Sequence, residues 1–206
     1  HFLRGEMTVL WLDFETRSRC DLRARGVYNY AQDPSTDVLC LSWAFDDEPV
    51  QTWRPGDPFP ERVRDHKGLI MAHNAAFDIV HFAPWMREPL TLCTLKAARV
   101  IYPEADNHKL TTLKYYLCLE GCHDRAHSAD EDVNVLMQLV KRMCQDAECG
   151  LPELLHIQNI PRKIHKMSFG KHRGKALSEL PKDYVNWLLT KADNIDSDLR
   201  ASLLAL

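Results

Sequence analysis

Alternation between hydrophobic and polar positions predicts a β-sheet in the first third of the chain. Residues 8–16 begin as an apolar run and end on alternating acids, which indicates a strand whose last side chains are polar. A second apolar run over 38–45, followed by a turn and the alternating residues 50–53, predicts a hairpin beside that strand. Residues 69–72 form a further short apolar run and complete the expected sheet.

Helical spacing dominates the rest of the chain. In several segments apolar residues recur every three or four positions, the pattern of helices with one buried face. The expected helices cover 75–85, 91–100, 110–121, 128–149 and 198–206, with one more beginning at residue 181. Residues 17–37 are polar and turn-rich, so we expect an irregular connection there.

The helix expected over 128–149 has the clearest pattern. Ser128 and Glu131 have the spacing of a capping box, in which each side chain pairs with the other residue's backbone amide. Steps of three and four from Asp132 reach a continuous apolar face. That face consists of Val135, Leu136, Leu139, Val140 and Met143. We therefore expect Asp132 to point toward the core, where a carboxylate needs a partner, and Asp130 and Glu131 to be solvated.

Two acids at the end of the first strand form a candidate metal site. Side chains at positions i and i+2 of a strand share a face, so Asp13 and Glu15 project together. Adjacent carboxylates repel each other unless a cation lies between them, and hard oxygen ligands suit Mg²⁺ or Mn²⁺. The alternative is an edge strand that frays into an acidic loop, and this stretch alone does not decide between them.

Composition is typical of a globular chain of one or two domains. The 206 residues are 45% hydrophobic and 27% charged, with no apolar run long enough to span a bilayer and no secretion signal. Seven scattered cysteines without such a signal indicate free thiols in a reducing compartment, so we expect a cytoplasmic protein. The expected domains are 7–150 and a small C-terminal module at 167–206, joined by a linker at 151–166. We expect residues 1–6 to be left from expression.

Charge is distributed unevenly along the chain. The net charge is −3, yet residues 161–175 contain six Lys or Arg and no acid. Within a glycine-punctuated loop of the C-terminal module, Lys171, Arg173 and Lys175 are candidates for contacts with the phosphates of nucleic acid. The same residues also fit an exposed, solvated turn, and charge alone does not separate the two interpretations.

A cluster of cysteine and histidine offers a second type of metal site. Cys118, Cys122, His123 and His127 lie close together in sequence and present sulfur and nitrogen ligands, as structural zinc sites do. Zinc ribbons and fingers normally place a longer spacer between their ligand pairs, which favours ordinary thiols here.

Three short motifs, in order, resemble those of a known nuclease family. They are Asp13-Phe14-Glu15-Thr16, then His73-Asn74-Ala75-Ala76-Phe77-Asp78, and finally His127 with Asp132 five positions later. Together they resemble the motifs of the DEDDh, DnaQ-like 3′→5′ exonucleases. Residues 13–53 are also similar to the start of the proofreading domain of some phage polymerases, whereas 93–99 and 169–175 resemble bacterial exonuclease X. Polymerase proofreading domains usually have tyrosine where this chain has Ser128, so the exonuclease X type is preferred.

The resemblance implies a fold, a metal site and a reaction. The implied fold is α/β and ribonuclease H-like, a mixed sheet flanked by helices, with a small C-terminal α+β module. Asp13, Glu15, Asp78 and Asp132 would hold two Mg²⁺ or Mn²⁺ ions, and His127 would act as general base. The implied reaction is hydrolysis of DNA from its 3′ end, single- or double-stranded, with release of nucleoside 5′-monophosphates.

The resemblance also implies contacts with the terminal nucleotide. The residues implied are Phe14, Thr16, Asn74 and Phe77. Simpler interpretations exist for three of them, because Asn74 fits a helix N-cap and both phenylalanines fit the core. Asp78 could likewise only complement a helix dipole.

Two other functions fit the same sequence. One is a 3′→5′ exoribonuclease of the same superfamily, because the acids do not distinguish RNA from DNA. The other is a non-catalytic nucleic-acid-binding or replication accessory module, which the complete set of acids argues against. We expect no membrane partner.

Overall fold

The chain divides into two compact units. The computed structural model describes residues 8–82, 90–119, 129–192 and 195–206. The first unit is His1–Gln158 and the second is Asn159–Leu206. Each unit is described by itself below.

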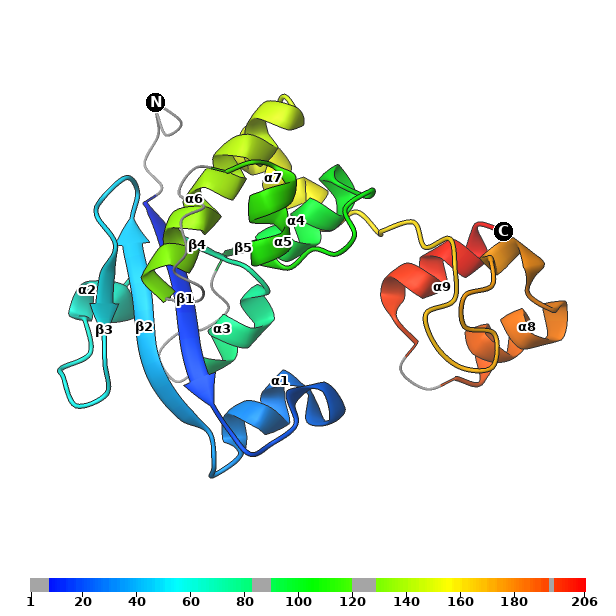
Figure 1. Cartoon of the computed structure of the whole chain (residues 1–206), viewed down its shortest axis with the longest axis horizontal. Coiled ribbons are helices and arrows are strands. Elements are labelled where there is room, and N and C mark those ends of the chain that lie inside the picture. Colours follow the sequence, from blue (N-terminus) through cyan, green and yellow to red (C-terminus); the bar gives the residue numbers. More distant parts are fainter. Residues whose placement is uncertain (1–7, 83–89, 120–128, 193–194) are drawn as a thin grey trace. The chain divides into compact units, whose positions relative to one another are not determined.

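The first unit is built on a five-stranded mixed sheet (Figure 1). Its strands are β1 (Val9–Arg17), β2 (Asp37–Phe45), β3 (Gln51–Trp53), β4 (Leu69–Ala72) and β5 (Thr91–Cys93). The order across the sheet is β3-β2-β1-β4-β5, with β1 antiparallel to β2 and parallel to β4. The predicted hairpin and the predicted mixed α/β sheet are confirmed, and the strand order is consistent with the expected ribonuclease H-like fold.

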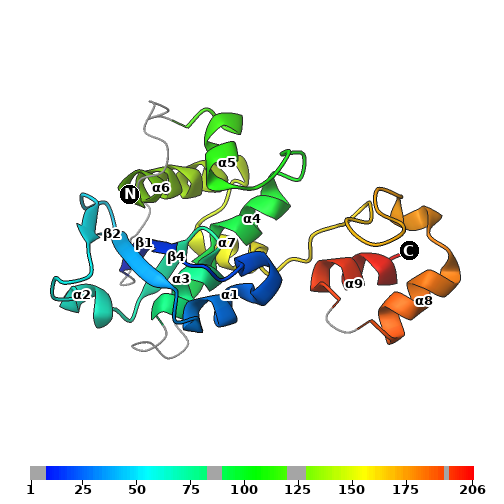
Figure 2. The ribbon, with the colours of Figure 1, turned by 60° about the horizontal axis from the view of Figure 1, so that its bottom comes forward.

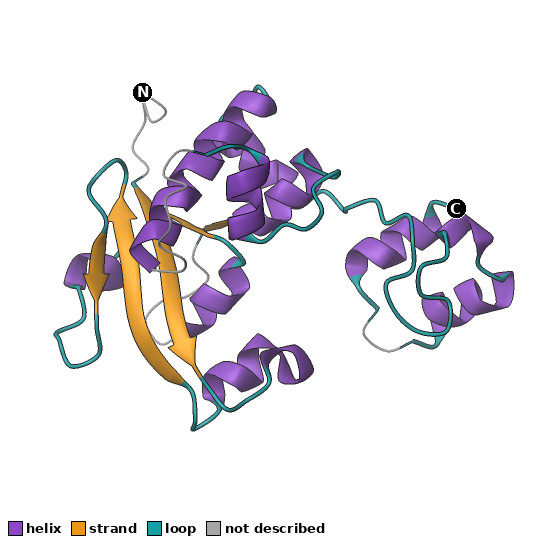
Figure 3. Ribbon diagram, in the orientation of Figure 1, coloured by secondary structure: helices purple, strands orange, loops and turns teal. Residues whose placement is uncertain are grey.

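Strict alternation along β1 gives the sheet two apolar faces. Val9 and Trp11 belong to one core cluster, and Leu10, Leu12 and Phe14 belong to the other. The first cluster lies under α4 (Thr94–Ile101), α5 (Leu110–Tyr116), α6 (Ala129–Asp146) and α7 (Leu151–Ile157). The second lies under α2 (Glu61–Arg64) and α3 (Ala75–Phe82). Helices therefore flank the sheet on both sides (Figure 3), and Asp13 and Glu15 continue the face that α6 covers.

Helix α6 has the predicted apolar face, with one correction at its first turn. The five apolar residues that follow Asp132 at helical spacing are all buried, and Asn134 is exposed. Glu131, which was expected to be solvated, has a side chain only 21% exposed and forms an ion pair with Lys114 of α5. Ser128 of the predicted capping box lies outside the described residues.

Residues 17–37 contain a helix that the sequence pattern does not predict. Helix α1 (Leu22–Gln32) begins at Asp21, whose carboxylate accepts hydrogen bonds from the amides of Arg23 and Ala24. Gly26 has φ 74° and ψ 164°, so the helix is kinked there. The kink and the polar composition together hide the helical spacing. In Figure 2 α1 lies beside α3.

Two other predicted boundaries are wrong. Residues 91–93, expected to start a helix, pair with β4 as strand β5, and the helix α4 begins at Thr94. Residues 151–157, expected to be linker, form α7, in which Leu154 is fully buried. Glu153 accepts a hydrogen bond from the amide of Gly150 and so caps this helix. The side chain of Gln158 fixes the end of α7 by bonding to the backbone of Thr91 and Cys93.

The second unit has its own small core. Its elements are the 3₁₀ turn η1 (Leu177–Glu179), α8 (Lys182–Thr190) and α9 (Ser197–Leu204), packed around a core cluster of six apolar residues. Those residues are Met167, Leu177, Leu180, Leu188, Leu199 and Leu203. The strand expected from residue 167 is reduced to a single bridge between Lys166 and Ala176, because Gly170 and Gly174 turn the chain at positive φ.

Two further findings concern the described residues of both units. None of their helices is long and apolar enough to cross a bilayer. The six cysteines that lie among them are free thiols, as expected.

Candidate metal centre

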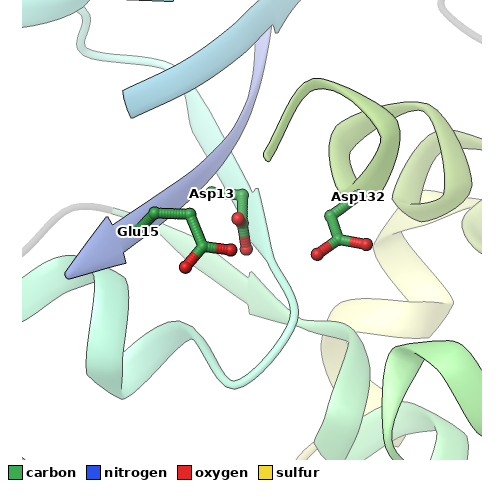
Figure 4. A group of neighbouring side chains, drawn as sticks. All are labelled: Asp13, Glu15 and Asp132. Carbon is green, nitrogen blue, oxygen red and sulfur yellow. The ribbon is translucent and has the colours of Figure 1, made fainter. Parts of the chain in front are cut away.

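Three carboxylates from β1 and α6 meet in one place. Asp13 and Glu15 project from β1, and Asp132 projects toward them from the first turn of α6 (Figure 4). Each offers one oxygen atom, and these atoms lie within 4.8 Å of one another. All three residues are half-buried. The two segments are more than 100 residues apart in sequence, so the fold and not the local chain brings them together.

Packing of α6 on β1 sets this meeting point. Val9 and Trp11 share the core cluster of α6 with Val135 and Leu136, so the apolar face of the helix lies on the face of β1 that continues into Asp13. Because Asp132 heads that apolar face, its carboxylate is directed at the polar end of the strand. The ion pair between Glu131 and Lys114 ties the same turn of α6 to α5.

The site strongly disfavours negative charge in the absence of a cation. Burial raises the pKa of Asp13 to about 8, and the neighbouring carboxylates of Asp132 and Glu15 add to the shift. A carboxyl group with that pKa is largely protonated at neutral pH. Such a perturbation marks a site built for a bound cation or for proton chemistry.

Asp78 is not one of the three carboxylates that meet within 4.8 Å. It is 1% exposed, and its Oδ1 accepts a hydrogen bond of 3.0 Å from the amide of Phe14. Burial raises the pKa of Asp78 well above its ordinary value, and the charge of the adjacent Asp13 raises it further. The carboxyl group thus sits against β1 next to Asp13, close enough for the two charges to interact. Asp78 therefore neighbours Asp13 without belonging to the group of three.

The donor set fits a hard divalent cation. Carboxylate oxygens are the ligands that Mg²⁺ and Mn²⁺ prefer, and three that repel one another at this separation lose that repulsion when a cation binds. Asp13, Glu15 and Asp132 are positioned to hold one, with Asp78 as an additional buried carboxyl beside Asp13.

The four residues predicted to contact a nucleotide occupy different environments. Phe14 is 5% exposed and its ring contacts Phe82, on the face of β1 opposite the carboxylates, so its burial argues against the predicted contact. Phe77 is half-buried and packs against Tyr30. Asn74 is exposed, with φ 70°, which is not the extended conformation of an N-cap.

Thr16 leads to a residue that the sequence pattern missed. Its hydroxyl lies 2.8 Å from the hydroxyl of Tyr30 in α1, and Tyr30 in turn packs on Phe77. Helix α1 is therefore fixed to the end of β1 beside the acids. The signal that predicts Tyr30 is the Asp21 N-cap, which places a helix where the composition suggests a loop.

His73 from the second motif is a structural residue. Its Nδ1 lies 2.9 Å from the Thr94 hydroxyl and its Nε2 lies 2.8 Å from the carbonyl oxygen of His108. Burial lowers the pKa of His73 to about 4, so the ring is neutral, and Nε2 donates its proton to the carbonyl while Nδ1 accepts from the hydroxyl. The ring joins the end of β4 to the start of α4.

Some predicted residues are placed elsewhere or are not described. His127 lies outside the described residues, as do Cys122 and His123 of the zinc alternative. Cys118 is exposed, and its thiol contacts the carbonyl oxygen of Tyr115. Further predicted residues are exposed in the second unit: Lys171, Arg173 and Lys175.

Sequence comparison finds nuclease relatives. Over 143 residues, 65% of this chain, the sequence is 27% identical to exodeoxyribonuclease 10 of Escherichia coli K12, and the same values hold for the protein of strain CFT073. The chain is a distant relative of exodeoxyribonuclease 10. Over 78 residues, 35% of the chain, it is also 37% identical to the DNA polymerase of Bacillus phage SP02. Exodeoxyribonuclease 10 is exonuclease X, so the predicted relation to that protein is confirmed as distant homology.

The relatives are longer than the region they share with this chain. The matches cover 62% of exodeoxyribonuclease 10 and 12% of the phage polymerase, so the chain spans less than two thirds of either.

Among solved structures, Brucella melitensis NrnC bound to pGG aligns with a TM-score of 0.48 at 16% identity, over 69% of this chain and 74% of that one. A family model described as "Putative quorum-sensing-regulated virulence factor" matches residues 157–193.

Proposed function

We propose that the chain is a metal-dependent 3′→5′ exodeoxyribonuclease that releases nucleoside 5′-monophosphates from DNA 3′ ends. The observation that carries the proposal is the meeting of Asp13, Glu15 and Asp132 within 4.8 Å. The distant relation to exodeoxyribonuclease 10 supports the reaction class. Nucleic acid is accordingly the proposed substrate.

The roles of the acids are proposed from their positions, and the role of His127 from the motif that it forms with Asp132. Asp13, Glu15 and Asp132 would hold two Mg²⁺ or Mn²⁺ ions together with Asp78, whose carboxyl lies beside Asp13. A pair of divalent ions, when bound, neutralises these acids and stabilises charge on the attacking and leaving oxygens. His127 accepts the proton of the attacking water, since neutral imidazole is available at working pH.

Substrate positioning is assigned to the edge of the site. Thr16, Asn74 and Phe77 are the proposed contacts with the terminal nucleotide, and Phe14 contributes mainly through its amide, which holds Asp78. Lys171, Arg173 and Lys175 of the second unit are proposed to contact phosphates.

Digestion of labelled oligonucleotides tests the proposal. Single-stranded DNA and RNA of matched sequence, labelled at the 5′ end, are incubated with Mg²⁺, Mn²⁺ or chelator. We expect a metal-dependent ladder that shortens from the 3′ end on DNA; digestion of RNA alone would favour the exoribonuclease alternative. Asp13→Ala should abolish the ladder, and His127→Ala should reduce the rate by about 10²-fold or more.

An exposed acid provides the matched control. Asp130 is in the same helical turn as Asp132 but is exposed, so Asp130→Ala should retain the wild-type rate while Asp132→Ala loses it. Normal digestion by Asp13→Ala or Asp132→Ala would refute the assignment, and equal losses in Asp130→Ala and Asp132→Ala would show a folding defect of α6 instead.

A further inference from the structure

We propose that the second unit carries a binding surface for single-stranded nucleic acid, in which Trp187 stacks on unpaired bases and the basic loop at 166–176 holds the adjacent phosphates. The inference rests on the proposed function for the class of ligand. The inference goes beyond the proposed function because it assigns base recognition to an aromatic pair that is not part of the metal centre.

The surface is an exposed aromatic platform on α8. Tyr184 and Trp187 are one helical turn apart, and their rings are stacked with centroids 5.8 Å apart at an interplanar angle of 18°. Tyr184 is half-buried, whereas Trp187 remains 50% exposed. The half-buried Tyr184 thus supports the indole by stacking, while Trp187 stays exposed to solvent. Large exposed aromatic side chains in this arrangement are typical of surfaces that stack nucleic-acid bases.

The basic loop contacts Tyr184 of this aromatic pair. The ring of His172 packs edge-on against Tyr184 at 4.5 Å, and the Lys171 ammonium lies 5.3 Å from the centre of the Tyr184 ring. A side chain at Gly170 would lie 3.2 Å from the Tyr184 hydroxyl, so the loop backbone approaches this residue closely. Lys171 of the basic loop therefore lies beside the stacked rings.

The loop keeps a defined shape. The amide of Met167 donates to the carbonyl of Lys175, and the amide of Gly174 donates to the carbonyl of Met167. Gly170 and Gly174 both have positive φ, which permits the tight turns between these bonds. The lysines and arginine of the loop are consequently presented on a closed hairpin-like scaffold.

Charge favours a polyanion as the ligand. Residues 159–206 contain nine Lys or Arg against five Asp or Glu. Of the six cations between 161 and 175, Arg162 is the one that forms an ion pair in the described part of the chain, with Asp198. The remaining five, including Lys171 and Arg173, leave their charge available to phosphates, and binding should therefore weaken with salt.

Equilibrium binding of the full chain to three DNA ligands tests the proposal. Fluorescence anisotropy in chelator, where the proposed hydrolysis is absent, compares a single-stranded DNA, the same strand with abasic sites in place of its bases, and the corresponding duplex. Trp187→Ala should weaken binding to the single strand by about fivefold or more and leave binding to the abasic strand unchanged. Trp187→Phe keeps a ring for stacking and should stay within about twofold of wild type.

The phosphate contacts have a different signature. The double substitution Lys171→Ala with Arg173→Ala should weaken binding to all three strands and reduce the slope of log affinity against log salt by about 1 to 2. Tyr28→Ala and Lys67→Ala, which remove an exposed aromatic and an exposed cation of the first unit, are the matched controls and should bind as wild type.

The outcomes separate this inference from the proposed nuclease function. An unchanged single-strand affinity in Trp187→Ala, or an equal loss on the abasic strand, would overturn base stacking. Binding should depend on Trp187 in the Asp13→Ala variant as well, because Asp13 belongs to the metal centre and not to the binding surface of the second unit. If Asp13→Ala digests DNA normally, the nuclease assignment fails while the binding result stands.

Discussion

At the residue scale, the central feature is a group of acids that the fold holds together against their mutual repulsion. Asp13 and Glu15 share a face of β1 and Asp132 completes the group from α6. This part of the site is predictable from sequence, because strand and helix periodicities each determine which way a side chain points. The position of Asp78 is not predictable in this way, since it depends on a hydrogen bond from the amide of Phe14.

The raised pKa of Asp13 predicts how the metal-free protein responds to pH. The folded-state value of about 8 exceeds the ordinary value of 3.8, so the folded state binds this proton more tightly than the unfolded state. The free energy of unfolding should therefore fall as pH rises from about 4 to about 8. Asp13→Asn removes the titration and should stabilise the metal-free protein by about 1–3 kcal/mol at pH 8.5, and by less at pH 5.

Chemical denaturation in chelator at the two pH values measures this difference. Asp130→Asn, in an exposed position, is the control and should show no comparable gain. A wild-type protein that becomes more stable between pH 5 and pH 8.5 relative to Asp13→Asn would contradict the assigned environment. Adding Mn²⁺ should reverse the ranking at pH 8.5, because the cation stabilises the wild-type carboxylates and not the amide.

At the scale of elements, α6 carries the second half of the metal centre and its first turn is held by neighbours. Sequence periodicity predicts its buried face correctly, but not the ion pair that Glu131 forms with Lys114. That pair depends on how α5 packs against α6, which no local pattern encodes. Helix α1 and Tyr30 were missed for a related reason, since Gly26 interrupts the helical spacing.

Breaking the pair between Lys114 and Glu131 should destabilise the first unit. Their side chains are 10% and 21% exposed, so Lys114→Met leaves a poorly solvated carboxylate and should cost about 1–3 kcal/mol of unfolding free energy. Adding Glu131→Gln should recover part of the loss, which a double-mutant cycle measures.

An exposed pair provides the comparison for that cycle. Arg17 and Asp37 have side chains 72% and 58% exposed, and Asp37→Asn should change stability by less than about 1 kcal/mol. Equal effects at both pairs, or no recovery in the double variant, would show that the buried pair does not hold the turn.

At the scale of the whole molecule, the chain combines two units with separate cores. The sequence indicates a basic C-terminal segment by charge alone, and the junction between Gln158 and Asn159 lies inside the expected linker. The first part of that linker is nevertheless the helix α7, which its buried Leu154 ties to the first core. The strand expected in the second unit is also missing, since two glycines turn the loop. Composition therefore predicts that a module exists, and packing decides where it begins.

Separate cores predict separate effects on stability. Leu188 is 1% exposed in the core cluster of the second unit, so Leu188→Ala should destabilise that unit by about 2–5 kcal/mol. Calorimetry should show one transition moved downward, while the transition that Mn²⁺ shifts upward stays in place. A Leu188→Ala protein in which the Mn²⁺-sensitive transition falls by the same amount would contradict independent cores.

The most direct test of the account is Mn²⁺ binding measured by titration calorimetry in the absence of nucleic acid. Wild type and Asp130→Asn should bind Mn²⁺ with the same affinity, whereas Asp132→Asn should bind at least about tenfold more weakly because it removes one of three converging carboxylates. Equal affinities in wild type and Asp132→Asn would mean that β1 and α6 do not share a metal site, and this result would contradict the proposed metal-dependent hydrolysis.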